Sequence, residues 1–145
     1  MPLPPFRSDG WLPEGHHSTT WEEVATRFGG TPGSTREKLT KKLLSLRDGL
    51  RACECQGRVL LDGSYVSHKS APGDFDVMLI LQPEIQAMKE NDSRLSRLLD
   101  AEMSENQDGV SIFYAPENSL VISQLLPLWD FAKDGTPKGI VEVKI

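Results

Sequence analysis

The sequence predicts a mixed α/β (α+β) fold in which helices back a β-sheet, built as a single domain over residues 1–145. Three observations lead to this prediction. Two segments carry the start signals and apolar spacing of helices, several short apolar runs have the length of strands, and the two kinds of segment alternate along the chain. Such alternation is typical of layered structures in which helices pack on a sheet. A chain of 145 residues with 38% hydrophobic residues can build one core and leaves little room for a second domain.

The first 18 residues are rich in proline, glycine and histidine and show no helical or strand pattern. We expect residues 1–18 to form an extended arm that lies on the domain. Three large apolar side chains in this segment, Phe6, Trp11 and Leu12, are expected to anchor the arm.

Two helices are expected to follow the arm, and a capping box starts each of them. Thr20 and Glu23 form the first box, and the helix should end near residue 28, before a Gly-Gly pair and a Pro-Gly pair. Ser34 and Glu37 form the second box, and this helix should extend to about residue 52. Leucines at spacings of four, three and four give it one apolar face: Leu39, Leu43, Leu46 and Leu50.

The period of the apolar residues then changes, and short strands are expected. Residues 83–99, between the strands expected at 74–81 and 110–115, look helical. Residues 118–126 are ambiguous between helix and strand. An Asp-Gly turn precedes the last strand. The expected strands are residues 59–61, 74–81, 110–115 and 139–145.

The charge of the chain narrows the classes of partner. The formal net charge of −5 disfavours wide electrostatic capture of DNA or RNA. A local group of basic residues on the second helix is expected to be a solvated face rather than a patch that follows phosphates. This group is Arg36, Lys38, Lys41 and Lys42.

The cysteines, histidines and apolar runs indicate a cytoplasmic protein. Cys53 and Cys55 are too close for an ordinary disulfide, and reduced thiols are the default in a cytoplasm. The three histidines do not have the spacing of zinc ligands. No signal peptide is expected, and no run approaches the ~20 apolar residues of a membrane helix.

The most informative segment is residues 63–76, where a Gly-Ser pair ends one strand and an Asp-x-Asp pair begins the next. Alternate residues of a strand point to one face, so Asp74 and Asp76 should project two carboxylates side by side. A divalent cation, Mg²⁺ (or Mn²⁺), removes the cost of their repulsion. Gly63 and Ser64 can bind phosphate oxygens, and Lys69 either holds a triphosphate or is a solvated loop lysine. Together these residues predict a site for a metal–nucleoside triphosphate.

Gly-Ser followed by Asp-x-Asp on an apolar strand resembles the minimal nucleotidyltransferases of the DNA polymerase β superfamily. The sequence of residues 61–66 and 72–77 looks closer to a little-characterised bacterial branch of nucleotidyltransferase-like proteins. In that branch an Asp-Gly-x-Leu-Pro-x-Gly-x-His segment is expected near the N-terminus and a Pro-Lys-Gly-Ile-Val segment near the C-terminus. This chain has matching text at residues 9–17 and 137–141, so the resemblance covers nearly all of it.

The resemblance implies a mixed sheet backed by helices, with the site at one sheet edge. It also implies transfer of a nucleoside monophosphate from a triphosphate to a hydroxyl of RNA or protein, with Asp74 and Asp76 as metal ligands and catalytic residues. Some relatives of this kind belong to toxin–antitoxin or phage-defence modules, which implies a cognate protein partner. Two alternatives stay open beside the enzyme: a non-catalytic binding protein on the same fold (an antitoxin or regulatory subunit), and a purely structural partner subunit.

The chain departs from the family at two places. Active members usually carry a third carboxylate on a later strand, and the expected strand 110–115 has no acid. Asp108 precedes this strand, Glu117 follows it, and Ser111 is the residue that could stand at the acid's place. The basic residue that often follows Gly-Ser is also missing, with His68 and Lys69 as substitutes.

Overall fold

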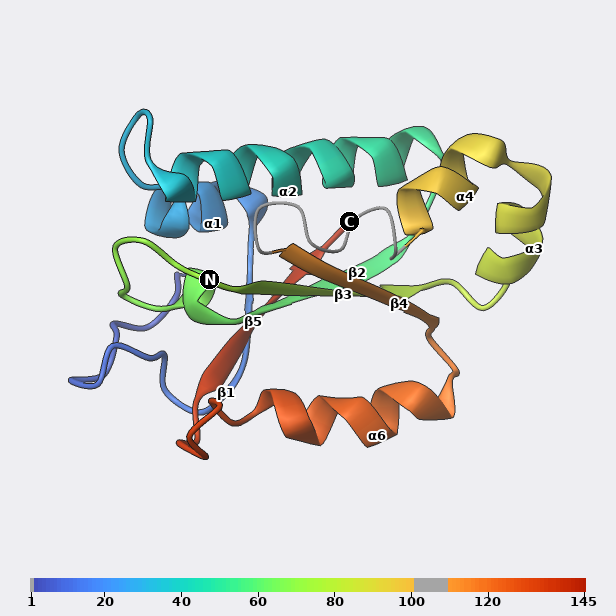
Figure 1. Ribbon diagram of the computed structural model, residues 1–145. Coiled ribbons are helices and arrows are strands. Elements are labelled where there is room, and N and C mark those ends of the chain that lie inside the picture. Colours follow the sequence, from blue (N-terminus) through green and yellow to red (C-terminus); the bar gives the residue numbers. More distant parts are fainter. Residues whose placement is uncertain (1, 101–109) are drawn as a thin grey trace.

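The computed structural model describes residues 2–100 and 110–145. It has a five-stranded mixed sheet with helices on both faces, which confirms the fold class expected from the sequence (Figure 1). The strand order is β1-β5-β2-β3-β4. The strands are β1 (Gly15–Thr19), β2 (Gly57–Asp62), β3 (Phe75–Leu81), β4 (Val110–Pro116) and β5 (Gly139–Lys144).

Strand direction determines which loops meet at the site. β2 runs antiparallel to both of its neighbours, β3 and β5, whereas β4 is parallel to β3 and β1 is parallel to β5. The end of β2 therefore lies at the same end of the sheet as the starts of β3, β4 and β5. The Gly-Ser segment that follows β2 and the Asp-x-Asp segment that begins β3 meet at this end.

The central strands are buried on both faces, which is why they appear in the sequence as continuous apolar runs. Alternate residues divide between two cores. Val59, Leu61 and Val77 belong to the larger core, which packs under four helices on one face. Leu60 and Met78 belong to the smaller core under a single helix on the other face (Figure 1).

The helices on the larger core begin where the capping boxes predict. α1 (Trp21–Phe28) is capped by Thr20, whose side chain accepts from the N–H of Glu23. α2 (Thr35–Ala52) is capped by Ser34, whose side chain accepts from the N–H of Glu37. Both helices end within a residue of the expected positions.

Three helices refine the sequence expectations. The segment expected to be helical over residues 83–99 forms two short helices, α3 (Ile85–Asn91) and α4 (Ser93–Leu99), because Asp92 has extended backbone and its side chain caps α4. The ambiguous segment is a helix, α6 (Leu120–Trp129), capped by Ser119 and packed on the second face of the sheet, where no other described helix lies (Figure 1). None of the described helices is long and apolar enough to cross a membrane.

The N-terminal arm is only partly an extended arm, because its last residues join the sheet. β1 forms an outer strand, parallel to β5, with Gly15 opposite Gly139 and Thr19 opposite Val143. The strand is largely exposed, and its sequence Gly-His-His-Ser-Thr has no alternation of apolar and polar residues. A strand of this kind cannot be predicted from apolar periodicity. The arm residues before β1 remain irregular and lie across the end of the sheet.

Candidate functional site

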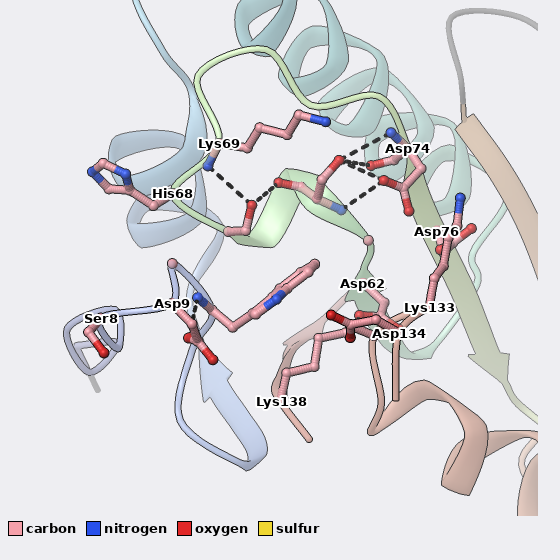
Figure 2. Close-up of a pocket in the computed structure, with 16 residues that line it drawn as sticks. Ser8, Asp9, Asp62, His68, Lys69, Asp74, Asp76, Lys133, Asp134 and Lys138 are labelled. Atoms are coloured by element: carbon pink, nitrogen blue, oxygen red, sulfur yellow. Dashed lines mark hydrogen bonds and ion pairs between the residues drawn. The ribbon is translucent and has the colours of Figure 1, made fainter. Parts of the chain in front are cut away.

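A cavity of about 750 Å³ opens at the end of the sheet where β2 ends and β3 begins (Figure 2). Three parts of the chain form its wall: the segment around the 3₁₀ turn η1 (Ser64–Val66), the N-terminal arm, and the loop between α6 and β5. All five residues that the sequence selected line it. The lining residues are Ser8, Asp9, Gly10, Trp11, Asp62, Gly63, Ser64, Ser67, His68, Lys69, Asp74, Asp76, Ala132, Lys133, Asp134 and Lys138.

Gly63 makes the turn from β2 into η1, and its backbone has φ of +85°. A side chain there would be strained, since this region favours glycine. A Cβ atom at this position would also lie 2.9 Å from the carbonyl oxygen of Asp74 and 3.0 Å from its Oδ2. Glycine thus allows the end of β2 to pass close to the residue that precedes β3.

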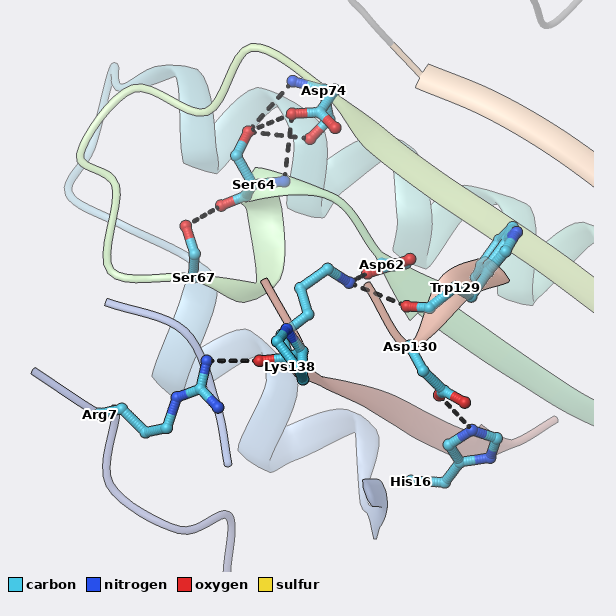
Figure 3. Close-up of polar contacts among 10 residues, drawn as sticks. Arg7, His16, Asp62, Ser64, Ser67, Asp74, Trp129, Asp130 and Lys138 are labelled. Carbon is cyan, nitrogen blue, oxygen red and sulfur yellow. Dashed lines mark hydrogen bonds and ion pairs between the residues drawn. The ribbon is translucent and has the colours of Figure 1, made fainter. Parts of the chain in front are cut away.

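Ser64 and Asp74 are joined by several hydrogen bonds (Figure 3). The Ser64 hydroxyl donates to Asp74 Oδ1 at 2.6 Å, and the Ser64 backbone N–H donates to the same oxygen at 3.2 Å. The hydroxyl oxygen accepts from the N–H groups of Gly73 and Asp74, at 3.0 and 3.2 Å. The donors expected to bind a phosphate therefore hold a carboxylate in this structure, and a phosphate oxygen can take them only after Asp74 turns away.

The side chain of Asp76 is half-buried, and its carboxylate makes no hydrogen bond or ion pair within residues 2–100 and 110–145. Burial raises the pKa of its carboxyl, and the neighbouring Asp74 raises it further, while Lys138 and Lys133 act in the opposite direction. Figure 2 shows Asp74 and Asp76 on the same side of the cavity. The two carboxylates are thus close enough to repel each other, and the oxygens of Asp76 are free to take a ligand.

The position of a third carboxylate is partly settled. Glu117 is excluded, because it follows the far end of β4, where its N–H donates to the carbonyl of Leu81 and its side chain pairs with Arg58 at 3.3 Å. Leu81 lies five positions beyond Asp76 along β3, a distance of roughly 16 Å. Ser111 lies opposite Asp76 in the β3–β4 register. Asp108 lies outside the described residues, and the described ones contain no group of three His, Cys, Asp or Glu that could hold a metal.

Sequence reasoning missed an ion pair between Lys138 and Asp62. The two side chains are 3% and 8% exposed, and the ammonium donates to Asp62 Oδ1 and, at 3.0 Å, to the carbonyl of Trp129 (Figure 3). Burial raises the pKa of Asp62 to about 6, although Lys138 lowers it. The sequence contains a signal for each residue. Asp62 directly precedes Gly63 of the Gly-Ser pair, and Lys138 lies in the Pro-Lys-Gly-Ile-Val segment that carries the family resemblance.

The N-terminal and C-terminal segments that carried the family resemblance lie side by side at the cavity. The N–H of Gly139 donates to the carbonyl of Leu12 at 3.1 Å, and Arg7 donates to the carbonyl of Pro137 at 2.6 Å. The ammonium of Lys138 lies 5.3 Å from the ring centre of Trp11. Trp11 lines the cavity, although its sequence position suggested an anchor in the core.

Arg36 corrects the expectation of a solvated basic face. It is buried, and its guanidinium donates to five backbone carbonyls at 2.6–3.4 Å, those of Phe28, Ser64, Tyr65, Ser67 and Lys69. The fixed fork of N–H donors suits this set of acceptors, whereas a lysine has only three. Arg36 thus fixes the backbone of residues 64–69, the segment that forms one wall of the cavity. Lys38 and Lys41, on the same helix, are exposed as expected, and so is Lys69 at the cavity wall.

A family model matches residues 4–144, and the chain belongs to that family, which is described as a family of unknown function (DUF6932). No curated protein and no solved structure matches the chain.

Proposed function

We propose that this protein is a Mg²⁺-dependent (or Mn²⁺-dependent) nucleotidyltransferase that moves a nucleoside monophosphate from a triphosphate to a hydroxyl of RNA or protein. The observation that supports the proposal best is the meeting of three kinds of group in one cavity. Two carboxylates, a Gly-Ser turn with backbone donors, and an exposed lysine line the same 750 Å³ space. A metal–triphosphate needs these groups: hard oxygen ligands for the cation, and N–H donors and positive charge for the phosphates.

The oxygen atoms of Asp74 and Asp76 fit a Mg²⁺ ion. Asp74 Oδ1 accepts from Ser64, whereas Asp74 Oδ2 and both oxygens of Asp76 accept no hydrogen bond from the part of the chain that the structure describes. Mg²⁺ is commonly held by one or two carboxylates, with waters and substrate phosphates completing the octahedron. Two converging carboxylates in a cavity open to water provide what such a site needs from the protein.

The residues of the chain then have separate tasks. Asp74 and Asp76 hold and orient the cation, while Gly63, Ser64 and Lys69 hold phosphate oxygens. When bound, the cation would lower the pKa of the attacking hydroxyl and neutralise the leaving pyrophosphate. Phosphoryl-type transfer depends mainly on positioning and charge stabilisation, so a site with few groups is sufficient.

The acceptor and setting follow from charge and resemblance. A net charge of −5 favours a protein side chain, or an RNA end delivered by a partner, over free RNA. We place the protein in the cytoplasm, where nucleoside triphosphates and both kinds of acceptor occur. A toxin–antitoxin or phage-defence module with a cognate protein partner is the setting that the resemblance suggests, and inspection of the neighbouring genes tests it.

A second candidate function is a non-catalytic protein that binds nucleotide on the same fold, as an antitoxin or regulatory subunit. Ser111 at the position opposite Asp76 favours this alternative, since a serine cannot bridge two cations as a carboxylate does. The alternative keeps nucleotide binding in the cavity but predicts no transfer.

The test is incubation with each α-labelled nucleoside triphosphate, Mg²⁺ or Mn²⁺, and cell extract. The proposal expects transfer of label by the wild type and its loss in Asp76→Ala. Binding of a triphosphate without transfer would favour the second candidate. Transfer that persists in both Asp74→Ala and Asp76→Ala would contradict the assignment of the site.

A further inference from the structure

Asp62 is the charged residue of β2 that lies next to Asp76 in the sheet. In the antiparallel register of β2 and β3, Asp62 lies directly opposite Asp76. Directly opposite residues point to the same face, with Cβ atoms ~4.5–5.5 Å apart. Among the described carboxylates, Asp62 is therefore the one that the strand register brings beside Asp76, and it also lines the cavity.

The carboxylate of Asp62 forms an ion pair with Lys138. Its ammonium donates to Asp62 Oδ1, and both side chains are almost fully buried, so the contact is not a solvent-screened surface pair. The last residue of α6 also fixes the lysine, because the carbonyl of Trp129 accepts from the same ammonium at 3.0 Å. Figure 3 shows the end of the Lys138 side chain with its contacts to both acceptors.

The ammonium retains one donor for a ligand. An ammonium has three N–H groups, and Asp62 and Trp129 take two of them. The third makes no hydrogen bond among residues 2–100 and 110–145, where the ammonium also faces the ring of Trp11 at 5.3 Å, and Lys138 lines the cavity. Its positive charge also lies within electrostatic range of the Asp76 carboxylate.

Among the described residues, no free carboxylate lies beside this lysine to hold a second divalent cation. Two-metal sites hold their ions about 3.5–4 Å apart and need carboxylates that bridge them. Of the described neighbours of Asp76, Ser111 carries no charge, and Asp62 is already neutralised by an ammonium that would repel a second cation.

We propose that the site binds a single divalent cation through Asp74 and Asp76, and that Lys138, held in place by Asp62, stands in for a second cation by donating to a phosphate oxygen of the ligand. This inference rests on the proposed function for the identity of its ligand. It explains how a nucleotidyltransferase-like site could work with Ser111 in place of the third acid. The positive charge that a second cation would supply comes from the ammonium of Lys138.

The test counts bound Mn²⁺ by electron paramagnetic resonance, with a non-hydrolysable nucleoside triphosphate analogue present. The wild type should bind one Mn²⁺ per chain. Lys138→Met frees Asp62 beside Asp76 and should bind two. Lys133→Met is the matched control, because it removes another positive charge of the cavity without freeing a buried carboxylate, and it should keep one.

A double variant covers the case in which Lys138→Met does not fold, since a buried carboxylate without its partner is strongly destabilising. Asp62→Asn/Lys138→Met removes both charges; it should bind one Mn²⁺ and bind the analogue about tenfold more weakly than the wild type. Unchanged affinity for the analogue in the double variant would overturn the role of Lys138. Two Mn²⁺ ions in the wild type would overturn the inference and leave the proposed function intact, whereas no bound Mn²⁺ would overturn both.

Discussion

Asp74 accepts hydrogen bonds from both the hydroxyl and the backbone N–H of Ser64, at 2.6 and 3.2 Å. Asp74 is thus both a proposed metal ligand and the group that fills the proposed phosphate-binding turn. A cation that draws Asp74 toward Asp76 would free the two donors of Ser64 for a phosphate oxygen. The relationship links the two halves of the proposed site through one side chain.

Divalent cations should stabilise the folded protein through Asp74 and Asp76. A ligand that binds only the folded state adds RT ln(1 + [L]/Kd), or about 2.7 kcal/mol at a hundredfold excess over Kd. Thermal melts with and without Mg²⁺ or Mn²⁺ should show a rise in Tm for the wild type and none for Asp74→Asn/Asp76→Asn. Asp134→Asn is the control, because Asp134 lines the same cavity at its exposed rim and should leave the rise unchanged. Equal rises in all three proteins would contradict the assignment.

Gly63→Ala should destabilise the protein by roughly 1–3 kcal/mol, because the new Cβ is strained by a φ of +85° and meets Asp74 at 2.9–3.0 Å. Gly135→Ala is a matched control: its φ is +88°, but nothing lies within 4 Å of the added Cβ. Urea unfolding of the two variants separates backbone strain from the contact with Asp74. Equal losses would show that the close approach of Gly63 to Asp74 has no energetic weight.

Arg36→Met should destabilise the protein by roughly 3–5 kcal/mol, because it removes the charged donors of several buried carbonyl groups at once. Arg36→Lys should recover only part of the loss, since an ammonium has three donors and a different geometry. Limited proteolysis should also find cleavage after residue 64 that the wild type resists. Lys41→Met, at an exposed position of the same helix, should change the free energy of unfolding by less than about 0.5 kcal/mol. A similar small change for Arg36→Met would refute its role behind the loop.

Asp62 should make folding stability depend on pH. Burial raises its pKa to about 6 in the folded protein, above the ordinary value of 3.8. The folded state therefore binds this proton more tightly, so the contribution of Asp62 to stability grows as pH falls through 6 and is lost as pH rises through it. Between pH 7 and pH 5 the gain should be about 1 kcal/mol.

The reference for this measurement is Asp62→Asn/Lys138→Met, which lacks both members of the pair. Its free energy of unfolding, subtracted from that of the wild type at each pH, removes the titration of all other groups. A difference that stays constant from pH 7 to pH 5, or that moves in favour of the variant, would be inconsistent with a raised pKa.

The sequence predicts the elements of this fold well where the signals are local. Thr20 and Ser34 each accept from an N–H three residues ahead, so four consecutive residues contain the whole signal for a helix start. The double burial of β2 and β3 gives continuous apolar runs. That Asp74 and Asp76 line one cavity was predictable for the same reason, since they are two residues apart, although Asp74 lies just before β3 and not on the strand as the sequence predicted.

The remainder of the site depends on distant contacts that no local pattern contains. Lys138 and Asp62 are 76 residues apart, and Arg36 reaches carbonyls about 30 residues away. Their burial depends on three-dimensional packing, whereas a charged residue in an isolated sequence is most simply placed in solvent. β1 was missed as a strand because it is an outer, largely polar strand fixed by its pairing with β5.

The measurement that tests the central claim most directly is isothermal titration calorimetry with non-hydrolysable analogues of the four nucleoside triphosphates. The account predicts that at least one analogue binds with one-to-one stoichiometry when Mg²⁺ is present. That binding should be lost in EDTA and weakened at least tenfold in Asp76→Ala, while Asp134→Asn binds like the wild type. Absence of binding for all four analogues, or an affinity that neither EDTA nor Asp76→Ala changes, would contradict a metal–triphosphate site in this cavity.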